Sequence, residues 1–84
     1  MAKISSELEQ QLRAEPNKIV DLIVRTRGDA TPHLDWLAAA NLRVTQQFRL
    51  VPGVAISCSG QDAIKLLTQD WVLSIELDQP VSTM

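Results

Sequence analysis

The chain has 84 residues, of which 45% are hydrophobic and 21% are charged, and this size fits one small domain rather than two. Its 8 basic and 10 acidic residues leave a formal net charge of -2, too little positive charge for a nucleic-acid or anionic-membrane surface. The one cysteine, Cys58, excludes an internal disulfide and a paired-cysteine metal site. We therefore expect one domain without metal or other cofactor, and without nucleic acid or membrane among its partners.

The beginning of the chain carries no apolar run of the kind that a signal peptide requires, and Glu7 and Glu9 stand where such a run would lie. The longest apolar stretches, 19–24 and 73–77, fall far short of the roughly 20 residues of a membrane helix. The sequence therefore predicts a cytoplasmic protein.

A short helix is predicted near the N-terminus. Ser6 and Glu9 have the spacing of a capping box, and Leu8 and Leu12 lie four residues apart on one side of the segment 7–14. The helix should end before Pro16.

A strand and a second helix follow. The β-branched run 19–27 predicts a strand whose even-numbered residues, from Val20 to Val24, form its buried face. Gly28 breaks this strand, and Thr31 and Pro32 are typical of a helix start. This second helix should reach about residue 41.

A hairpin is predicted in the middle of the chain. The segment 44–50 reads as a strand with Val44, Phe48 and Leu50 on one face and polar side chains, Arg49 among them, on the other. The pair Pro52-Gly53 is typical of a type II turn, so the chain should reverse there.

After that turn, alternation predicts a strand over 54–58 that buries Val54, Ile56 and Cys58. Ser59 is a suitable cap for a helix over 60–69, and the segment 71–77 reads as the last strand.

The predicted order is a helix followed by βαββαβ. Two right-handed crossovers joined by a hairpin give an α+β, ferredoxin-like, two-layer sandwich with a four-stranded antiparallel sheet. Both helices of the repeat would cover one sheet face and leave the other open. We divide the chain into an N-terminal helical extension (1–17), the ferredoxin-like domain (18–78) and an exposed C-terminal tail (79–84).

Catalytic chemistry finds little support among these residues. His33, Cys58 and Asp35 are the residue types of a cysteine-nucleophile site. However, Cys58 alternates with apolar residues toward the core, where a thiol behaves as a small hydrophobe, whereas His33 falls in an exposed first helical turn. We therefore expect no enzyme activity.

Two further pairs are candidate binding residues. Trp36 and Trp71 could mark a ligand pocket, although packing at the core or its rim is the commoner role. Glu76 and Asp78 lie two residues apart on a strand, so both carboxylates point the same way and could meet a cation or the positive end of a partner's helix. A solvated strand end explains this pair equally well.

A longer pattern spans about residues 18 to 84. It consists of Val44, Phe48, Gly53-Val54-Ala55, Ala63, Leu66-Leu67, Val72, Ile75-Glu76 and Asp78. This pattern resembles subtilisin propeptides and the small fungal protease inhibitors related to them. The resemblance implies that the open sheet face packs on two parallel surface helices of a subtilisin-like serine protease. It also implies that Glu76 and Asp78 cap the N-termini of those helices.

The same resemblance places the tail in the protease's substrate cleft. Met84 would fill the first specificity pocket and Val81 the fourth, with Ser82 and Thr83 between them. The chain would thus be a product-like inhibitor whose tail adds a strand to the cleft, and also a folding chaperone. Because no protease domain follows Met84 in this sequence, we expect it to act in trans.

A different class of function stays open beside this one. Ferredoxin-like domains similar to amino-acid-sensing modules bind small ligands and regulate other proteins, commonly as dimers. The single Gly28 between Arg27 and Thr31 provides no glycine-rich ligand loop, which disfavours this alternative. The sequence does not determine the oligomeric state.

Overall fold

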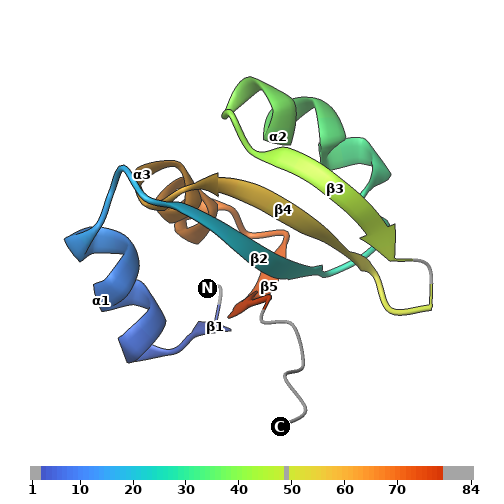
Figure 1. Cartoon of the computed structure of the whole chain (residues 1–84). Coiled ribbons are helices and arrows are strands. Elements are labelled where there is room, and N and C mark those ends of the chain that lie inside the picture. The colour runs from blue at the N-terminus through green and yellow to red at the C-terminus, as the bar shows by residue number, and fades with distance from the viewer. Residues whose placement is uncertain (1–2, 49, 79–84) are drawn as a thin grey trace, which may run out of the picture.

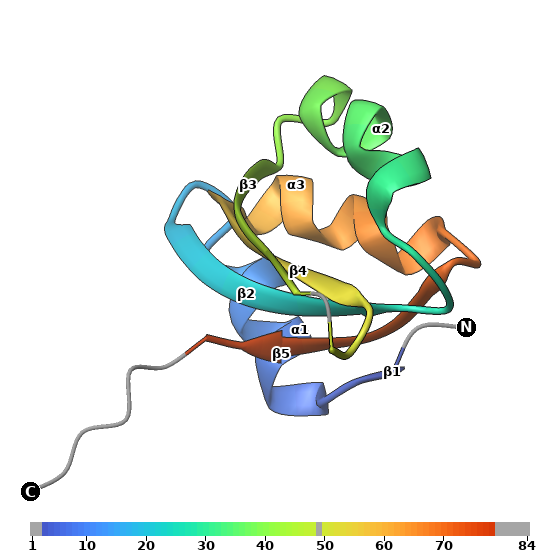
Figure 2. The same cartoon turned by 90° about the vertical axis from the view of Figure 1, so that its right-hand side faces the viewer.

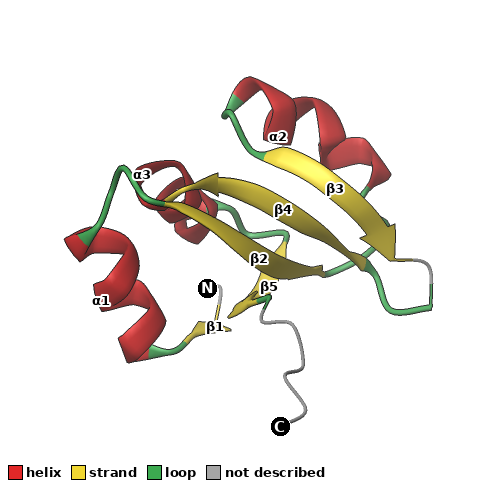
Figure 3. Ribbon diagram, in the orientation of Figure 1, coloured by secondary structure: helices red, strands yellow, loops and turns green. Residues whose placement is uncertain are grey.

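The structure is a computed structural model that describes residues 3–48 and 50–78. Helices and strands are mixed along the chain (Figure 1; Figure 3), which confirms the α+β class. The elements are β1 (Lys3–Ile4), α1 (Ser6–Ala14), β2 (Ile19–Thr26), α2 (Leu34–Ala39), β3 (Arg43–Phe48), β4 (Gly53–Ser59), α3 (Gly60–Ala63) and β5 (Val72–Leu77). Two 3-10 helices, Thr31–His33 and Ile64–Thr68, lie directly before α2 and directly after α3.

The described strands form one five-stranded sheet in the order β1-β5-β2-β4-β3. Neighbouring strands from β5 to β3 are antiparallel. β1 instead runs parallel to β5, with Lys3 opposite Ser74 and Ile4 opposite Ile75. The prediction of a four-stranded, wholly antiparallel sheet is therefore wrong. The fifth strand has only two residues, too few for the alternation from which a strand is predicted.

The core lies between one face of the sheet and the helices. Figure 2 shows α2 and α3 on the same side of the strands. The even-numbered residues of β2 and β4 point to that side, as predicted, and Leu22, Val24, Val54 and Ile56 are at most 1% exposed. Burying such side chains is the main favourable term in folding a domain this small.

The N-terminal segment belongs to this same core. In α1, Leu8 and Leu12, which were predicted to lie on one side of a helix, are both buried, and the helix packs against α3. The contact is close at Gly60, where an added Cβ would lie 2.5 Å from the Leu12 carbonyl oxygen and 2.9 Å from that of Glu15. A side chain at Gly60 would therefore force the two helices apart.

The caps of the helices differ in detail from those predicted. Ser5, not Ser6, caps α1, because its hydroxyl accepts a hydrogen bond from the backbone N–H of Leu8 at 3.1 Å. Ser59 caps α3 as predicted, accepting from the N–H of Asp62 at 3.4 Å. The two later helices are shorter than predicted because their outer turns are 3-10 rather than α-helical.

The hairpin between β3 and β4 departs most from its prediction. A bulge between Val44 and Gln46 shifts the register, so Val44 faces the core opposite Ile56 while Phe48 points to the opposite face, opposite Gly53. Leu50 lies outside the strand and is 101% exposed, and Arg49 is outside the described residues. The prediction that Val44, Phe48 and Leu50 share one buried face is therefore wrong.

The predicted type II turn at Pro52-Gly53 is also wrong. That turn needs a positive φ at its glycine, and no glycine of the chain's described part has one. Gly53 is instead the first residue of β4, where an added Cβ would lie 2.7 Å from the carbonyl oxygen of Val24. Close approach of two strands, rather than a turn conformation, is the reason that glycine suits this position.

Candidate functional site

The sheet face turned away from α2 and α3 is the candidate site, and we call it the open face. Strand alternation assigns residues to it, and the pairing register places them beside one another. Its members are Asp21, Ile23 and Arg25 of β2; Gly53, Ala55 and Ser57 of β4; Arg43, Gln46 and Phe48 of β3; and Ser74 and Glu76 of β5.

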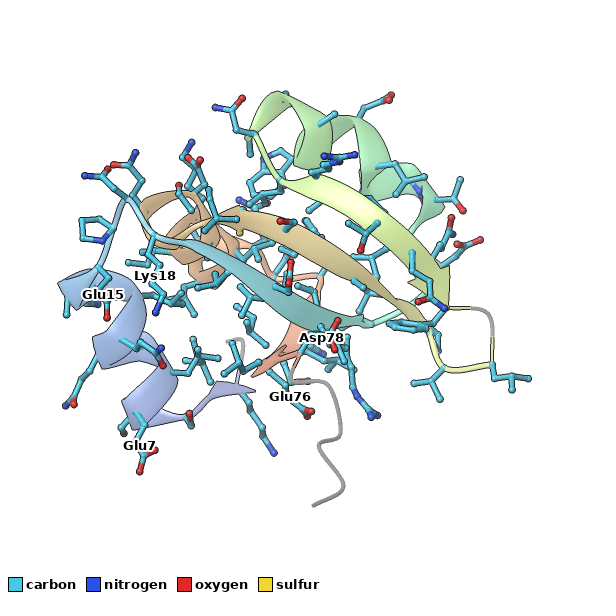
Figure 4. The ribbon with its side chains drawn as sticks, in the orientation of Figure 1. Glu7, Glu15, Lys18, Glu76 and Asp78 are labelled. Carbon is cyan, nitrogen blue, oxygen red and sulfur yellow. The ribbon has the colours of Figure 1, made fainter. Side chains whose placement is uncertain are left out.

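Glu76 and Asp78, the two predicted binding residues, lie together at the C-terminal end of β5. Figure 4 labels both there, away from Glu7, Glu15 and Lys18, which lie on or next to α1. Both carboxylates are exposed, and neither takes part in an ion pair among the residues that the structure describes. The two charges are therefore free to meet a partner.

A third acid, Asp21, joins this pair. The backbone N–H of Asp78 donates to the carbonyl oxygen of Asp21 at 2.9 Å, which continues the pairing of Leu22 with Leu77. Asp21 therefore lies directly opposite Asp78 and on the same face. The sequence prediction missed its role, although the alternation of β2 already indicated that Asp21 is on the solvent side.

The opposite end of the open face is apolar. A hollow of about 430 Å³ there is lined by Ile23, Phe48, Leu50, Val51 and other residues of the β3–β4 hairpin. Leu50 and Val51 are 101% and 49% exposed, so the rim of the hollow presents apolar side chains to solvent. Sequence reasoning missed this hollow because it assigned Phe48 and Leu50 to the buried face.

The cysteine-nucleophile hypothesis finds no support in the structure. Cys58 is 4% exposed, and burial raises the pKa of its thiol to about 12, assisted by the negative charges of Asp62 and Asp21. His33 is instead stacked on Trp71, with ring centroids 4.1 Å apart and planes within 5°. A thiol with such a pKa is not a nucleophile at neutral pH.

The two tryptophans pack at the rim of the core. Both are half-buried against the core cluster, and their rings meet edge to face with centroids 5.6 Å apart. The indole N–H of Trp71 donates to the side-chain oxygen of Gln69 at 3.2 Å. The packing interpretation of Trp36 and Trp71 is therefore confirmed.

The remaining predicted binding residues, Val81, Ser82, Thr83 and Met84, lie outside the described residues. Within residues 3–48 and 50–78, no group of three or more potential ligands is arranged to hold a metal ion. The helices in that part of the chain are too short and too polar to cross a membrane.

The geometry thus defines a small α+β domain with an exposed sheet face that carries Asp21, Glu76 and Asp78 on β2 and at the end of β5, and a mostly apolar hollow at the β3–β4 hairpin. Comparisons with protein-family models, with curated proteins and with solved structures found no match. Any functional conclusion must therefore come from the face itself and from the sequence pattern.

Proposed function

We propose that the protein is a propeptide-like inhibitor of subtilisin-type serine proteases that acts in trans. In this proposal the open face packs on surface helices of the protease, and the segment 79–84 enters its substrate cleft as a product-like strand. The same mode of binding would let the protein assist folding of the protease, because it stabilises the folded enzyme preferentially.

The observation that carries the proposal is the placement of Glu76 and Asp78. Two exposed carboxylates on one sheet face, unpaired within the described residues, suit the N-termini of helices, where unpaired N–H groups and the helix dipole favour negative charge. Such contacts contribute about 0.3–1 kcal/mol each when exposed and up to about 2 kcal/mol when partly buried.

The connection between these acids and the tail supports the same function. Asp78 precedes the segment 79–84 directly, so a partner that holds Glu76 and Asp78 also fixes where that segment starts. Holding one end of a short strand raises its effective concentration at a neighbouring cleft. The apolar residues Val81 and Met84 suit apolar specificity pockets.

The strand arrangement is a further support. Strands β5, β2, β4 and β3 are joined antiparallel in that spatial order, with two helical crossovers between them. This arrangement within the five-stranded sheet is the one that the ferredoxin-like interpretation requires, and β1 adds to its β5 edge without covering the open face.

An inhibition assay with a charge-neutralised variant tests the proposal. Intact protein at micromolar concentration should inhibit a subtilisin-like protease, and the Glu76→Gln, Asp78→Asn double variant should raise the inhibition constant about tenfold or more, the ratio that corresponds to ~1.4 kcal/mol. The matched control is Glu7→Gln with Asp35→Asn, which removes the same two charge types from exposed positions on α1 and α2. Equal inhibition by the two double variants would exclude the proposed role of the acids.

The small-ligand alternative gains little from the geometry. In the loop between β2 and α2, the Thr26 hydroxyl donates to the carbonyl oxygen of Gly28, and the Asp29 carboxylate accepts from the N–H of Thr31 at 2.9 Å. These polar groups are thus already engaged with one another. We therefore retain protease inhibition as the proposed function.

A further inference from the structure

The hollow at the β3–β4 hairpin has the size and the lining of a small-molecule site. Its volume of about 430 Å³ lies within the roughly 300–1,000 Å³ that is common for ligand pockets. Most of the residues that line it are apolar, namely Ile23, Phe48, Leu50, Val51 and Pro52. Ligand pockets are typically apolar with a few polar groups that orient the ligand. The polar residues of this hollow therefore indicate which class of molecule it takes.

Arg25 is the one charged residue among the described residues that line the hollow. The strand register places Arg25 and Phe48 on either side of Gly53, which contributes no side chain between them. Their Cα atoms are two strand spacings apart, which is about 10 Å. The hollow thus has a positive charge on one side and an aromatic ring on the other. Its other two polar residues, Gln46 and Gln47, are uncharged and do not repel an anion.

The charge of Arg25 is not neutralised within the described part of the chain, where no ion pair includes it. Glu76 is its diagonal neighbour on β5, opposite Ile23, but Glu76 does not line the hollow. A guanidinium group binds a carboxylate through two parallel hydrogen bonds. A carboxylate carries one negative charge, whereas a phosphate monoester carries nearly two. The single arginine and the acid nearby therefore favour a carboxylate.

We infer that the hollow binds a small apolar molecule that carries one carboxylate. The carboxylate binds the guanidinium group of Arg25, and the apolar body lies over Gly53 against Phe48 and Val51. Covering these apolar side chains favours binding, because it removes apolar surface from water. The site is separate from the loop between β2 and α2, and the inference does not depend on protease inhibition.

Octanoate tests this inference, because it joins an unbranched apolar chain to one carboxylate. In a titration of the isotope-labelled full chain, followed by the chemical shifts of its backbone amides, the dissociation constant should be about 1 mM or below, as expected for about ten non-hydrogen atoms. The largest shifts should occur at residues that line the hollow. Octylammonium has the same chain with a positive charge, and it should bind at least about fivefold more weakly.

Substitution of Arg25 tests the role of its charge. Arg25→Met removes the charge but keeps an unbranched side chain, and it should raise the dissociation constant of octanoate at least about fivefold. Arg43→Met is the matched control, because Arg43 is also exposed on the open face but does not line the hollow. This control should change the dissociation constant less than about twofold. Thermal melting of both variants checks that the fold is intact.

Octanoate binding at the hollow that Arg25→Met weakens and Arg43→Met leaves unchanged would support the inference. No binding of octanoate at about 10 mM, equal affinity for octylammonium, equal affinity in Arg25→Met, or shifts confined to residues elsewhere would each overturn it. If Arg25→Met does not fold, the comparison of octanoate with octylammonium on the intact protein still decides. A negative result leaves the proposed protease inhibition untouched, because these measurements contain no protease.

Discussion

Asp21 and Asp78 lie directly opposite each other on neighbouring strands, joined by a hydrogen bond of 2.9 Å from the N–H of Asp78 to the carbonyl oxygen of Asp21. Like charges in directly opposite positions destabilise a sheet by a few tenths to about 1 kcal/mol. A domain that keeps such a pair on an exposed face carries a feature that its own folding does not require. In the proposed complex, the positive ends of the partner's helices relieve this repulsion.

Neutralising one member of the pair should therefore stabilise the free protein but weaken its binding to the protease. We expect Asp21→Asn to raise the free energy of unfolding by a few tenths of a kcal/mol, and to weaken protease inhibition. Urea denaturation and the inhibition constant measure the two effects. The control Asp35→Asn removes an exposed charge from α2 and should change neither quantity. A stability loss in Asp21→Asn would assign the carboxylate a structural role.

The junction between α1 and α3 gives a second prediction. Gly60→Ala places a Cβ within 2.5–2.9 Å of two backbone oxygens and should lower the free energy of unfolding by about 1–3 kcal/mol. Gly28→Ala meets nothing within 4 Å and should be neutral or stabilising by up to about 1 kcal/mol. Urea midpoints of the two variants compare them directly. Equal midpoints would mean that α1 does not pack on α3 as described.

Cysteine accessibility provides a third prediction. Because the pKa of the Cys58 thiol is raised to about 12 by burial, almost none of it is thiolate at pH 8. A thiol reagent should therefore leave the native protein unmodified over the time in which it labels the urea-unfolded chain completely. Mass spectrometry measures the fraction labelled. Rapid labelling of the folded protein would contradict the packing of Cys58 in the core.

The cap of α3 gives a prediction about pH. Hydrogen bonds from the Lys65 and Ser59 side chains lower the pKa of Asp62, whose carboxylate lies 2.9 Å from the Lys65 ammonium. A lowered pKa in the folded state adds stability above the unfolded pKa, which is about 3.9, and loses it as the pH falls through the folded value. The stability difference between the intact protein and Asp62→Asn should therefore be present at pH 7 and shrink below about pH 4. A difference that does not change with pH would exclude this cap interaction.

Much of the fold could be predicted from the sequence where the residues within a single helix or strand determine which side of it is buried. The alternation of β2 and β4 predicted their buried faces, and Leu8 and Leu12 predicted the inner side of α1. These predictions depend only on the periodicity of strands and helices. The placement of Glu76 and Asp78 on one exposed face was predictable in the same way.

The predictions are wrong where the structure depends on contacts between segments that are far apart in the sequence. Strand β1 exists only because Lys3 and Ile4 meet the free edge of β5, about seventy residues later. The bulge after Val44 depends on the pairing of β3 with β4, and it turns Phe48 to the open face. The hollow was unpredictable for the same reason, since it requires both that bulge and the close approach of Gly53 to Val24.

The most direct test of the proposed function compares inhibition by the full chain and by a chain that ends at Pro80. Both should melt at the same temperature, because the buried core of the described residues ends at Ile75. We predict that the full chain inhibits a subtilisin-like protease at micromolar concentration or below, and that removing Val81 to Met84 raises the inhibition constant at least tenfold. Equal inhibition by the two chains, or no inhibition by either, would contradict the proposal that the protein is a product-like inhibitor.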